Sequence, residues 1–272
     1  MQDTNITPNI AVFCDFENVA LGVKETTMPA FEINKVLDRL LLKGNIVVKK
    51  AYCDWQRYKE FKAPMHEAAF ELIEVPHTRM AGKNSADIRM VVDALDLCYT
   101  KEHMDTFAVI TGDSDFSPLV SKLRENNKRV IGIGVKNSSS NLLISNCDEF
   151  IFYDDLVDKK SRRRKKPKET AGKSKAKSSE KSPVTDSSET VVSNEALEIV
   201  VEVIEDLLRE RGDQKVWSSM VKQTLRRQHP DFNETAFGYK NFSALLEQAR
   251  DKGLMQLERD DNSGNYLILG VN

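Results

Sequence analysis

Thr111-Gly112-Asp113-Ser114-Asp115-Phe116 lies between two segments with different patterns. The apolar run at residues 107–110 predicts a buried strand, and residues 118–123 predict the first turns of a helix. Two carboxylates, Asp113 and Asp115, therefore lie where a strand ends and a helix begins. In an open parallel sheet, ligands bind at this edge. Asp and Ser also cap helices, so the hexapeptide alone is equally consistent with an ordinary helix start.

The first 157 residues alternate between predicted strands and predicted helices. Strands are predicted at residues 9–14, 46–52, 72–75, 107–110, 129–135 and 149–152. Helical spacing of apolar residues predicts helices over 31–42, over 55–70, from Ser85 onward and after residue 118. This alternation predicts an α/β fold with a mostly parallel sheet covered by helices on both faces.

Acidic residues from other segments are predicted to lie at the same edge of the sheet. Asp15 ends the first strand, and Asp87 lies in the first turn of the helix that starts at Ser85. With Asp113 and Asp115, four carboxylates come from three segments. Close carboxylates repel one another unless a cation lies among them, and such oxygen ligands favour Mg²⁺ or Mn²⁺. One or two bound metals could activate a water and stabilise the leaving oxygen of a phosphodiester.

Each of these residues also has a simpler structural interpretation. Asp15 could merely begin a turn, with Asn18 as the cap of the next helix. Asp87 could be a first-turn acid that the helix dipole favours. Asp93, six residues later, is predicted to lie on a different face of the helix. Lys83 could neutralise a phosphate or be a solvated loop lysine.

The segments Phe13-Cys14-Asp15-Phe16-Glu17-Asn18, Gly82-Lys83-Asn84-Ser85-Ala86-Asp87 and the hexapeptide keep the order and spacing of a known family. Over about residues 8–155 the chain resembles the NYN domain, a branch of the PIN-like nucleases. The resemblance implies a PIN-like fold and a metal-dependent ribonuclease, usually endonucleolytic. It also implies that Asn18 is the family's amide after the first Asp, and that the metal-binding acids are Asp15, Asp87, Asp113 and Asp115.

A basic segment follows this predicted domain. Between Lys159 and Lys181 the chain has twelve Lys or Arg and two Glu, a net charge of +10, which leaves −12 for the rest of a chain whose total is −2. Large apolar residues are nearly absent, so residues 158–193 are predicted to be a flexible linker. The segment could bind RNA phosphates, act as a nuclear address or simply solubilise the chain. The arginines expected to contact RNA are Arg162, Arg163 and Arg164.

Residues 194–272 are predicted to form a second, smaller domain. Helical spacing predicts three helices, and two short strands flank a turn at residues 260–265. Three helices and a hairpin make a winged-helix unit. Residues 217–222 and 237–242 resemble the LOTUS or OST-HTH domain, which is implicated in binding RNA or partner proteins. The side chains expected to contact RNA are Lys222, Arg226, Arg227, Lys240 and Tyr239, with core packing as the alternative for Tyr239.

The bulk composition excludes several other classes. A hydrophobic content of 40% is sufficient for ordinary packed cores. No apolar run approaches the roughly 18 residues of a membrane span, and the amino terminus has no signal-peptide layout. The cysteines have no Cys-x-x-Cys pair, which argues against a zinc cage or disulfide scaffold and favours a reducing compartment. We therefore expect a soluble cytoplasmic protein. The cysteines are Cys14, Cys53, Cys98 and Cys147.

Three functions remain open from the sequence. The first is a ribonuclease with an acidic metal site, directed to RNA by the second domain. The second is a non-catalytic RNA-binding adaptor. The third is a haloacid-dehalogenase-like phosphatase with Asp15 as the nucleophile. That fold normally has an Asp two residues after the nucleophile, and this chain has Glu17 there.

Overall fold

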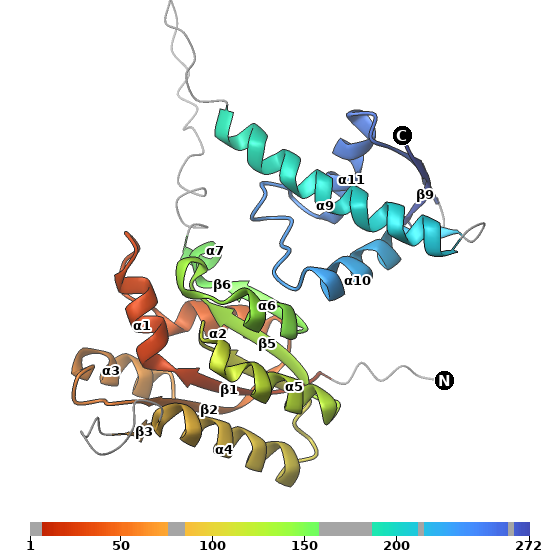
Figure 1. The fold of residues 1–272 in the computed structure, drawn as a ribbon. Helices are drawn as coiled ribbons and strands as arrows, with labels where there is room; N and C mark the ends of the chain where they lie inside the picture. The colour runs from red at the N-terminus through yellow and green to blue at the C-terminus, as the bar shows by residue number, and fades with distance from the viewer. Residues whose placement is uncertain (1–6, 76–84, 158–186, 212–214, 261–263) are drawn as a thin grey trace, which may run out of the picture. The chain divides into compact units, whose positions relative to one another are not determined.

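The chain forms two compact units, Met1–Arg162 and Arg163–Asn272, which are shown in Figure 1. The computed structural model describes residues 7–75, 85–157, 187–211, 215–260 and 264–272. The two units are treated separately below.

The first unit contains a six-stranded sheet with the strand order β3-β2-β1-β4-β5-β6. Every neighbouring pair is parallel, which confirms the predicted α/β class. The strands are β1 (Asn9–Asp15), β2 (Asn45–Cys53), β3 (Glu71–Glu74), β4 (Thr106–Ile110), β5 (Arg129–Gly134) and β6 (Glu149–Phe152).

The sheet reverses its strand order between β1 and β4. Cys14 pairs with Ile110, so these two strands end almost level with each other. Side chains alternate across β1: Ile10 and Val12 pack in one core, whereas Ala11 packs in the other. In parallel sheets, the carboxyl ends of strands flanking such a reversal open into a crevice. The fold therefore places Asp15 and the segment after Ile110 side by side.

Helices cover both faces of the sheet (Figure 1). The core on one face includes residues of α1, α2, α3 and α7, and the core on the other face includes residues of α4, α5 and α6. The helices are α1 (Phe16–Lys24), α2 (Ile33–Leu41), α3 (Lys59–Glu67), α4 (Ser85–Thr100), α5 (Ser117–Glu125), α6 (Asn141–Asn146) and α7 (Tyr153–Val157).

The sequence prediction missed α1, α6 and α7 and made α3 too long. Helix α1 follows β1 without a break, so its apolar residues continue the pattern of the strand. Helices α6 and α7 have six and five residues, too few to show a helical period. Helix α3 contains Pro64 and spans nine residues rather than the predicted 55–70.

The second unit packs helices against a small antiparallel sheet with the order β7-β9-β8. Its first helix begins at Ser187, within the range 158–193 that was predicted as a linker. No proline or glycine interrupts the sequence between Ser187 and Arg211, and the helix extends beyond its apolar stripe. The elements are α9 (Ser187–Arg211), β7 (Val216–Trp217), α10 (Ser218–Gln228), α11 (Phe242–Asp251), β8 (Met255–Arg259) and β9 (Tyr266–Val271).

A substitution at Gly132 of β5 tests how tightly the core of the first unit is packed. A Cβ at this position would lie 2.4 Å from the Phe150 ring and 2.8 Å from Cys147 Sγ. We expect Gly132→Ala to lower the free energy of unfolding by about 1–3 kcal/mol, because the core must shift to admit the methyl group. In β9, nothing lies within 4 Å of a Cβ built at Gly270. Gly270→Ala should therefore change the free energy of unfolding by less than about 0.5 kcal/mol. Urea denaturation followed by circular dichroism measures both, and equal losses would contradict this packing.

Candidate active site

Asp15 is the last residue of β1 and also the N-cap of α1. Its Oδ1 atom accepts a hydrogen bond from the backbone N–H of Asn18 at 3.3 Å. The residue is only 7% exposed. A carboxylate so deeply buried is uncommon unless its oxygens are hydrogen-bonded or paired. Asp15 is itself the cap of α1, whereas the simpler interpretation had it begin a turn with Asn18 as the cap.

Thr111 connects Asp15 to the segment that follows β4. The buried hydroxyl of Thr111 donates to Asp15 Oδ2 at 3.1 Å. The hydroxyl oxygen of Thr111 in turn accepts a hydrogen bond from the backbone N–H of Asp113 at 3.2 Å. Thr111 was not among the residues predicted for the site. Its position directly after a strand was the only signal, and threonine is common there.

Asn18 fixes the same segment from the other side. Its Oδ1 atom accepts a hydrogen bond from the Gly112 backbone N–H at 2.8 Å. It lies inside α1, so it is not the helix cap that the simpler interpretation proposed. Gly112 has no room for a side chain, because a Cβ would lie 2.3 Å from the Ser138 carbonyl oxygen. Asn18 therefore positions the segment carrying Asp113.

Asp113 and Asp115 follow this anchored glycine. Asp113 caps the 3-10 helix η1 (Ser114–Phe116), and its Oδ1 atom accepts a hydrogen bond from the Asp115 N–H at 2.9 Å. Asp113 is half-buried and Asp115 is exposed. The helix-start interpretation is thus also correct here, and the same geometry leaves both side chains at the carboxyl edge of the sheet.

Asp87 is close enough to Asp15 to affect its charge. The pKa of Asp15 is raised to about 7: burial is the largest cause, and the negative charges of Asp87 and Asp113 contribute to the rise. Hydrogen bonds from Asn18 and Thr111 oppose this rise. The fold therefore places acids from β1, α4 and the segment after β4 near one another. Within the described ranges, however, no three His, Cys, Asp or Glu side chains lie close enough together to hold a metal ion.

Asp93 belongs to a different polar cluster. It accepts a hydrogen bond from the Tyr52 hydroxyl at 2.9 Å. It also forms ion pairs with Arg89 at 3.1 Å and with Lys50 at 3.6 Å. These contacts attach α4 to β2, next to the strand that ends in Asp15. Asp93 helps to fix the helix that carries Asp87.

The residues predicted to contact RNA have different environments in the second unit. Arg226, Arg227 and Lys240 are exposed. Lys222 is already engaged: its ammonium lies 2.9 Å from Glu234 and 5.6 Å from the centre of the Phe242 ring.

The structure corrects the prediction that Tyr239 contacts RNA. It is 7% exposed and packs in the core of the second unit, so its ring does not present a face for stacking on a base. The alternative interpretation, core packing, was the right one. Four other predicted contacts lie outside the described residues: Lys83, Arg162, Arg163 and Arg164.

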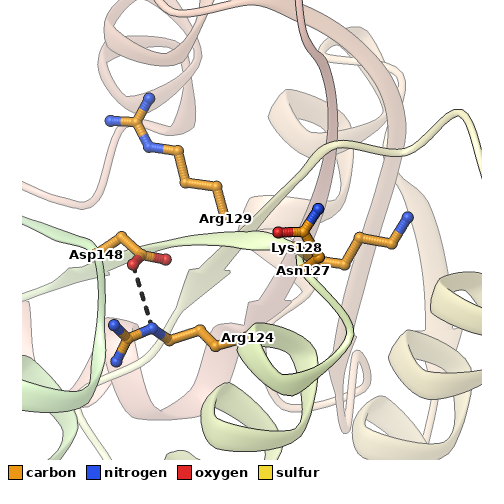
Figure 2. A pocket seen from close by; sticks show the side chains of 5 residues that line it. All are labelled: Arg124, Asn127, Lys128, Arg129 and Asp148. Atoms are coloured by element: carbon orange, nitrogen blue, oxygen red, sulfur yellow. Dashed lines mark ion pairs between the residues drawn. The ribbon is translucent and has the colours of Figure 1, made fainter.

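A basic pocket of about 520 Å³ lies at the opposite, amino-terminal edge of the sheet, where β5 begins (Figure 2). Arg124 Nε forms an ion pair with Asp148 at 3.1 Å. Three cationic side chains and one carboxylate favour an anion here. The pocket is separate from the acidic site. Its lining residues are Arg124, Asn127, Lys128, Arg129 and Asp148.

Comparison with known families agrees with both sequence resemblances. The model of the NYN domain matches residues 9–154. The chain belongs to the NYN domain family. The model of the OST-HTH/LOTUS domain matches residues 195–266, so the predicted order of the two domains is confirmed.

Two individual proteins are also similar to this NYN chain. The uncharacterized protein MJ0482 of Methanocaldococcus jannaschii is 28% identical over 142 residues, which cover 52% of this chain and 54% of that protein. This chain therefore spans about half the length of the curated relative it matches. A crystal structure of a protein of unknown function, VPA0982 from Vibrio parahaemolyticus, superposes with a TM-score of 0.51 at 26% identity. The match covers 58% of this chain and 99% of the VPA0982 chain.

By these matches, the first domain belongs to the PIN-like nuclease superfamily and the second to the OST-HTH/LOTUS family. In the described parts of the chain, no helix is both long enough and apolar enough to cross a lipid bilayer. The four cysteines are buried and free.

The raised pKa of Asp15 predicts that Asp15→Asn increases the stability of the fold, by an amount that depends on pH. The ionised carboxylate destabilises the fold, because its folded pKa is about 7 and its usual value is 3.8. The penalty is absent below the usual pKa, grows as the pH rises, and reaches at most about 4 kcal/mol above pH 7. Without divalent metal, we expect Asp15→Asn to be more stable than the wild type at pH 8, with a gain that shrinks as the pH falls towards 4.

Urea denaturation in a chelating buffer at both pH values measures this gain. The exposed acid Asp38 provides the control, since Asp38→Asn should change stability little at either pH. If Asp15→Asn and the wild type were equally stable at pH 8, burial of the Asp15 charge would not be a source of instability.

Proposed function

We propose that this NYN protein is a metal-dependent ribonuclease that cuts RNA endonucleolytically. One observation carries the proposal: buried Asp15 is held by Thr111 and Asn18 where the strand order reverses, with acids from two other segments nearby. Hydrolysis of a phosphodiester requires stabilisation of the attacking and leaving oxygens, which a metal held by carboxylates can provide.

The donor set fits Mg²⁺ or Mn²⁺, because both prefer carboxylate oxygens. Burial contributes most to the raised pKa of Asp15, and repulsion from Asp87 and Asp113 adds to it. A bound cation would relieve that repulsion. When bound, the cation supplies activation of a water and stabilisation of negative charge on the phosphate. The carboxylates must draw closer together than they lie in the structure. The residues proposed to hold it are Asp15, Asp87, Asp113 and Asp115.

The surrounding residues orient the acids. Thr111 binds one oxygen of Asp15 and the backbone of Asp113, so it fixes the relation between two of the proposed ligands. Asn18 holds Gly112 in place from α1. Residues of this kind keep metal ligands in their working orientation, and removing them commonly reduces activity about 10–100-fold.

The second unit is proposed to bring RNA to this site. Its exposed Arg226, Arg227 and Lys240 can bind phosphate oxygens without reading the sequence. Contacts of this kind weaken as salt concentration rises, because bound counterions are released from RNA. The same surface could also take a protein partner, which is the second activity known for LOTUS domains.

The phosphatase alternative is disfavoured by one contact. Glu17, at the position where a phosphatase has its acid, forms an ion pair with Arg57 at 3.2 Å. The non-catalytic adaptor remains the competing hypothesis, and the cleavage assay separates it from the nuclease.

We expect the purified chain to cleave labelled single-stranded RNA with Mn²⁺ or Mg²⁺ and not in EDTA. Asp113→Asn should lower the rate by about 100-fold or more, because a metal contributes several kcal/mol to transition-state stabilisation. Thr111→Val, which keeps the shape and removes the hydroxyl, should lower it about tenfold. Gel separation of the products distinguishes internal from terminal cuts.

Asp38→Asn is the matched control and should cleave like the wild type, since Asp38 is an exposed acid on α2. Equal cleavage by Asp113→Asn and the wild type would overturn the assignment of the site. Tight RNA binding without metal-dependent cleavage of any substrate would instead support the adaptor.

A further inference from the structure

Helix α4 has a second apolar face beside the one that packs in the core. One face packs in the core of the first unit through Met90, Ala94 and Cys98. At 100° per residue, Ile88, Val92, Leu95 and Tyr99 fall within about 60° of one another on the outward side. We call these four residues the α4 stripe.

The α4 stripe is largely open to solvent. Ile88 is 64% exposed, Val92 55% and Tyr99 58%. Leu95 is partly buried, because it lies at the edge of the stripe nearest the core and packs against it. An amphipathic surface helix normally has polar residues opposite its core face, and a helix that is apolar all round is normally covered. Four apolar residues at alternating spacings of four and three are also the pattern by which one helix packs against another.

Charged residues flank the α4 stripe on one side. Arg89 and Asp96 lie seven residues apart, which places both on the same edge of the stripe. In an antiparallel pair related by a two-fold axis, Arg89 of each chain lies beside Asp96 of the partner subunit, and the match occurs twice. The apolar residues match as well: Val92 lies opposite Leu95 of the partner subunit. The stripe is thus complementary to itself in its apolar residues and in its flanking charges.

We propose that two copies of this protein pair through their α4 stripes as an antiparallel, two-fold symmetric dimer. Arg89 can form this contact with the partner subunit and still keep its ion pair with Asp93 of its own chain. Its Nε atom lies 3.1 Å from Asp93, and a guanidinium has further N–H donors at its two terminal nitrogens. Asp96 is exposed and can accept them. This inference does not depend on the proposed nuclease activity.

The contact is small, so the dimer dissociates on dilution. Helix α4 has 16 residues and is about 24 Å long. Interfaces below about 1,200 Å² are characteristic of weak, transient complexes. The antiparallel arrangement also sets the spacing of the acidic sites, because Asp87 lies in the first turn of α4. The two copies of Asp87 are offset by about 20 Å along the helix pair.

Sedimentation velocity of the full chain over a dilution series tests the pairing. We expect the wild type to shift from monomer to dimer with rising concentration, and Val92→Glu to weaken the dimer by about 100-fold or more, because it places a charge in the apolar contact. Leu42→Glu is the matched control: Leu42 is 77% exposed but follows α2, away from α4. It should dimerise like the wild type. A wild type that stays monomeric, or a dimer that Val92→Glu leaves intact, would overturn the proposal.

Charge reversal tests the antiparallel orientation. Arg89→Asp places only acids on the flank, and Asp96→Arg places only arginines there, so each variant alone should dimerise about tenfold more weakly than the wild type. Mixed together, the two variants should form a heterodimer, because every flanking pair is then of opposite charge. Circular dichroism of each variant establishes that it is folded. A mixture that associates no better than its components would contradict the pairing of Arg89 with Asp96.

Discussion

The hydrogen bond from the Thr111 hydroxyl to Asp15 joins the two central strands at their carboxyl ends. It forms because β1 and β4 are neighbours in parallel register, with Cys14 level with Ile110. Asp15 follows Cys14 and Thr111 follows Ile110, so these two residues lie side by side and their side chains can form the hydrogen bond. The same threonine oxygen holds the backbone of Asp113, and Asn18 holds Gly112 from the opposite side. The geometry of the proposed metal site therefore follows from the register of one strand pair.

Burial makes this arrangement unstable when no cation is present. Asp15 is buried near two other carboxylates, and its raised pKa records the free energy required to ionise it there. Sites of this kind commonly lower stability in exchange for activity, because the charges are placed for a ligand rather than for the fold. The hydrogen bonds from Thr111 and Asn18 offset only part of that destabilisation. A divalent cation would offset more of it and would couple metal binding to folding.

Much of the first unit was predictable because its determinants are local. Apolar runs bounded by turns gave all six strands, and strand ends gave the positions of Asp15 and Asp113. Thr111 was missed because its role depends on a partner 96 residues away in the sequence, which a local pattern does not reveal. Tyr239 was misplaced for a similar reason: an aromatic residue beside a lysine suggests a nucleic-acid surface, but tertiary packing buries the ring. Helix α1 was missed because it continues directly from β1.

The central claim is that acids from three segments share one divalent cation at the carboxyl edge of the sheet. Anomalous diffraction from crystals of the full chain soaked in Mn²⁺ tests it most directly. We predict an anomalous peak among the carboxylates of Asp15, Asp87, Asp113 and Asp115, with these side chains drawn together around it. Manganese peaks only at other surface acids, with this edge of the sheet empty in the loaded crystal, would contradict the account.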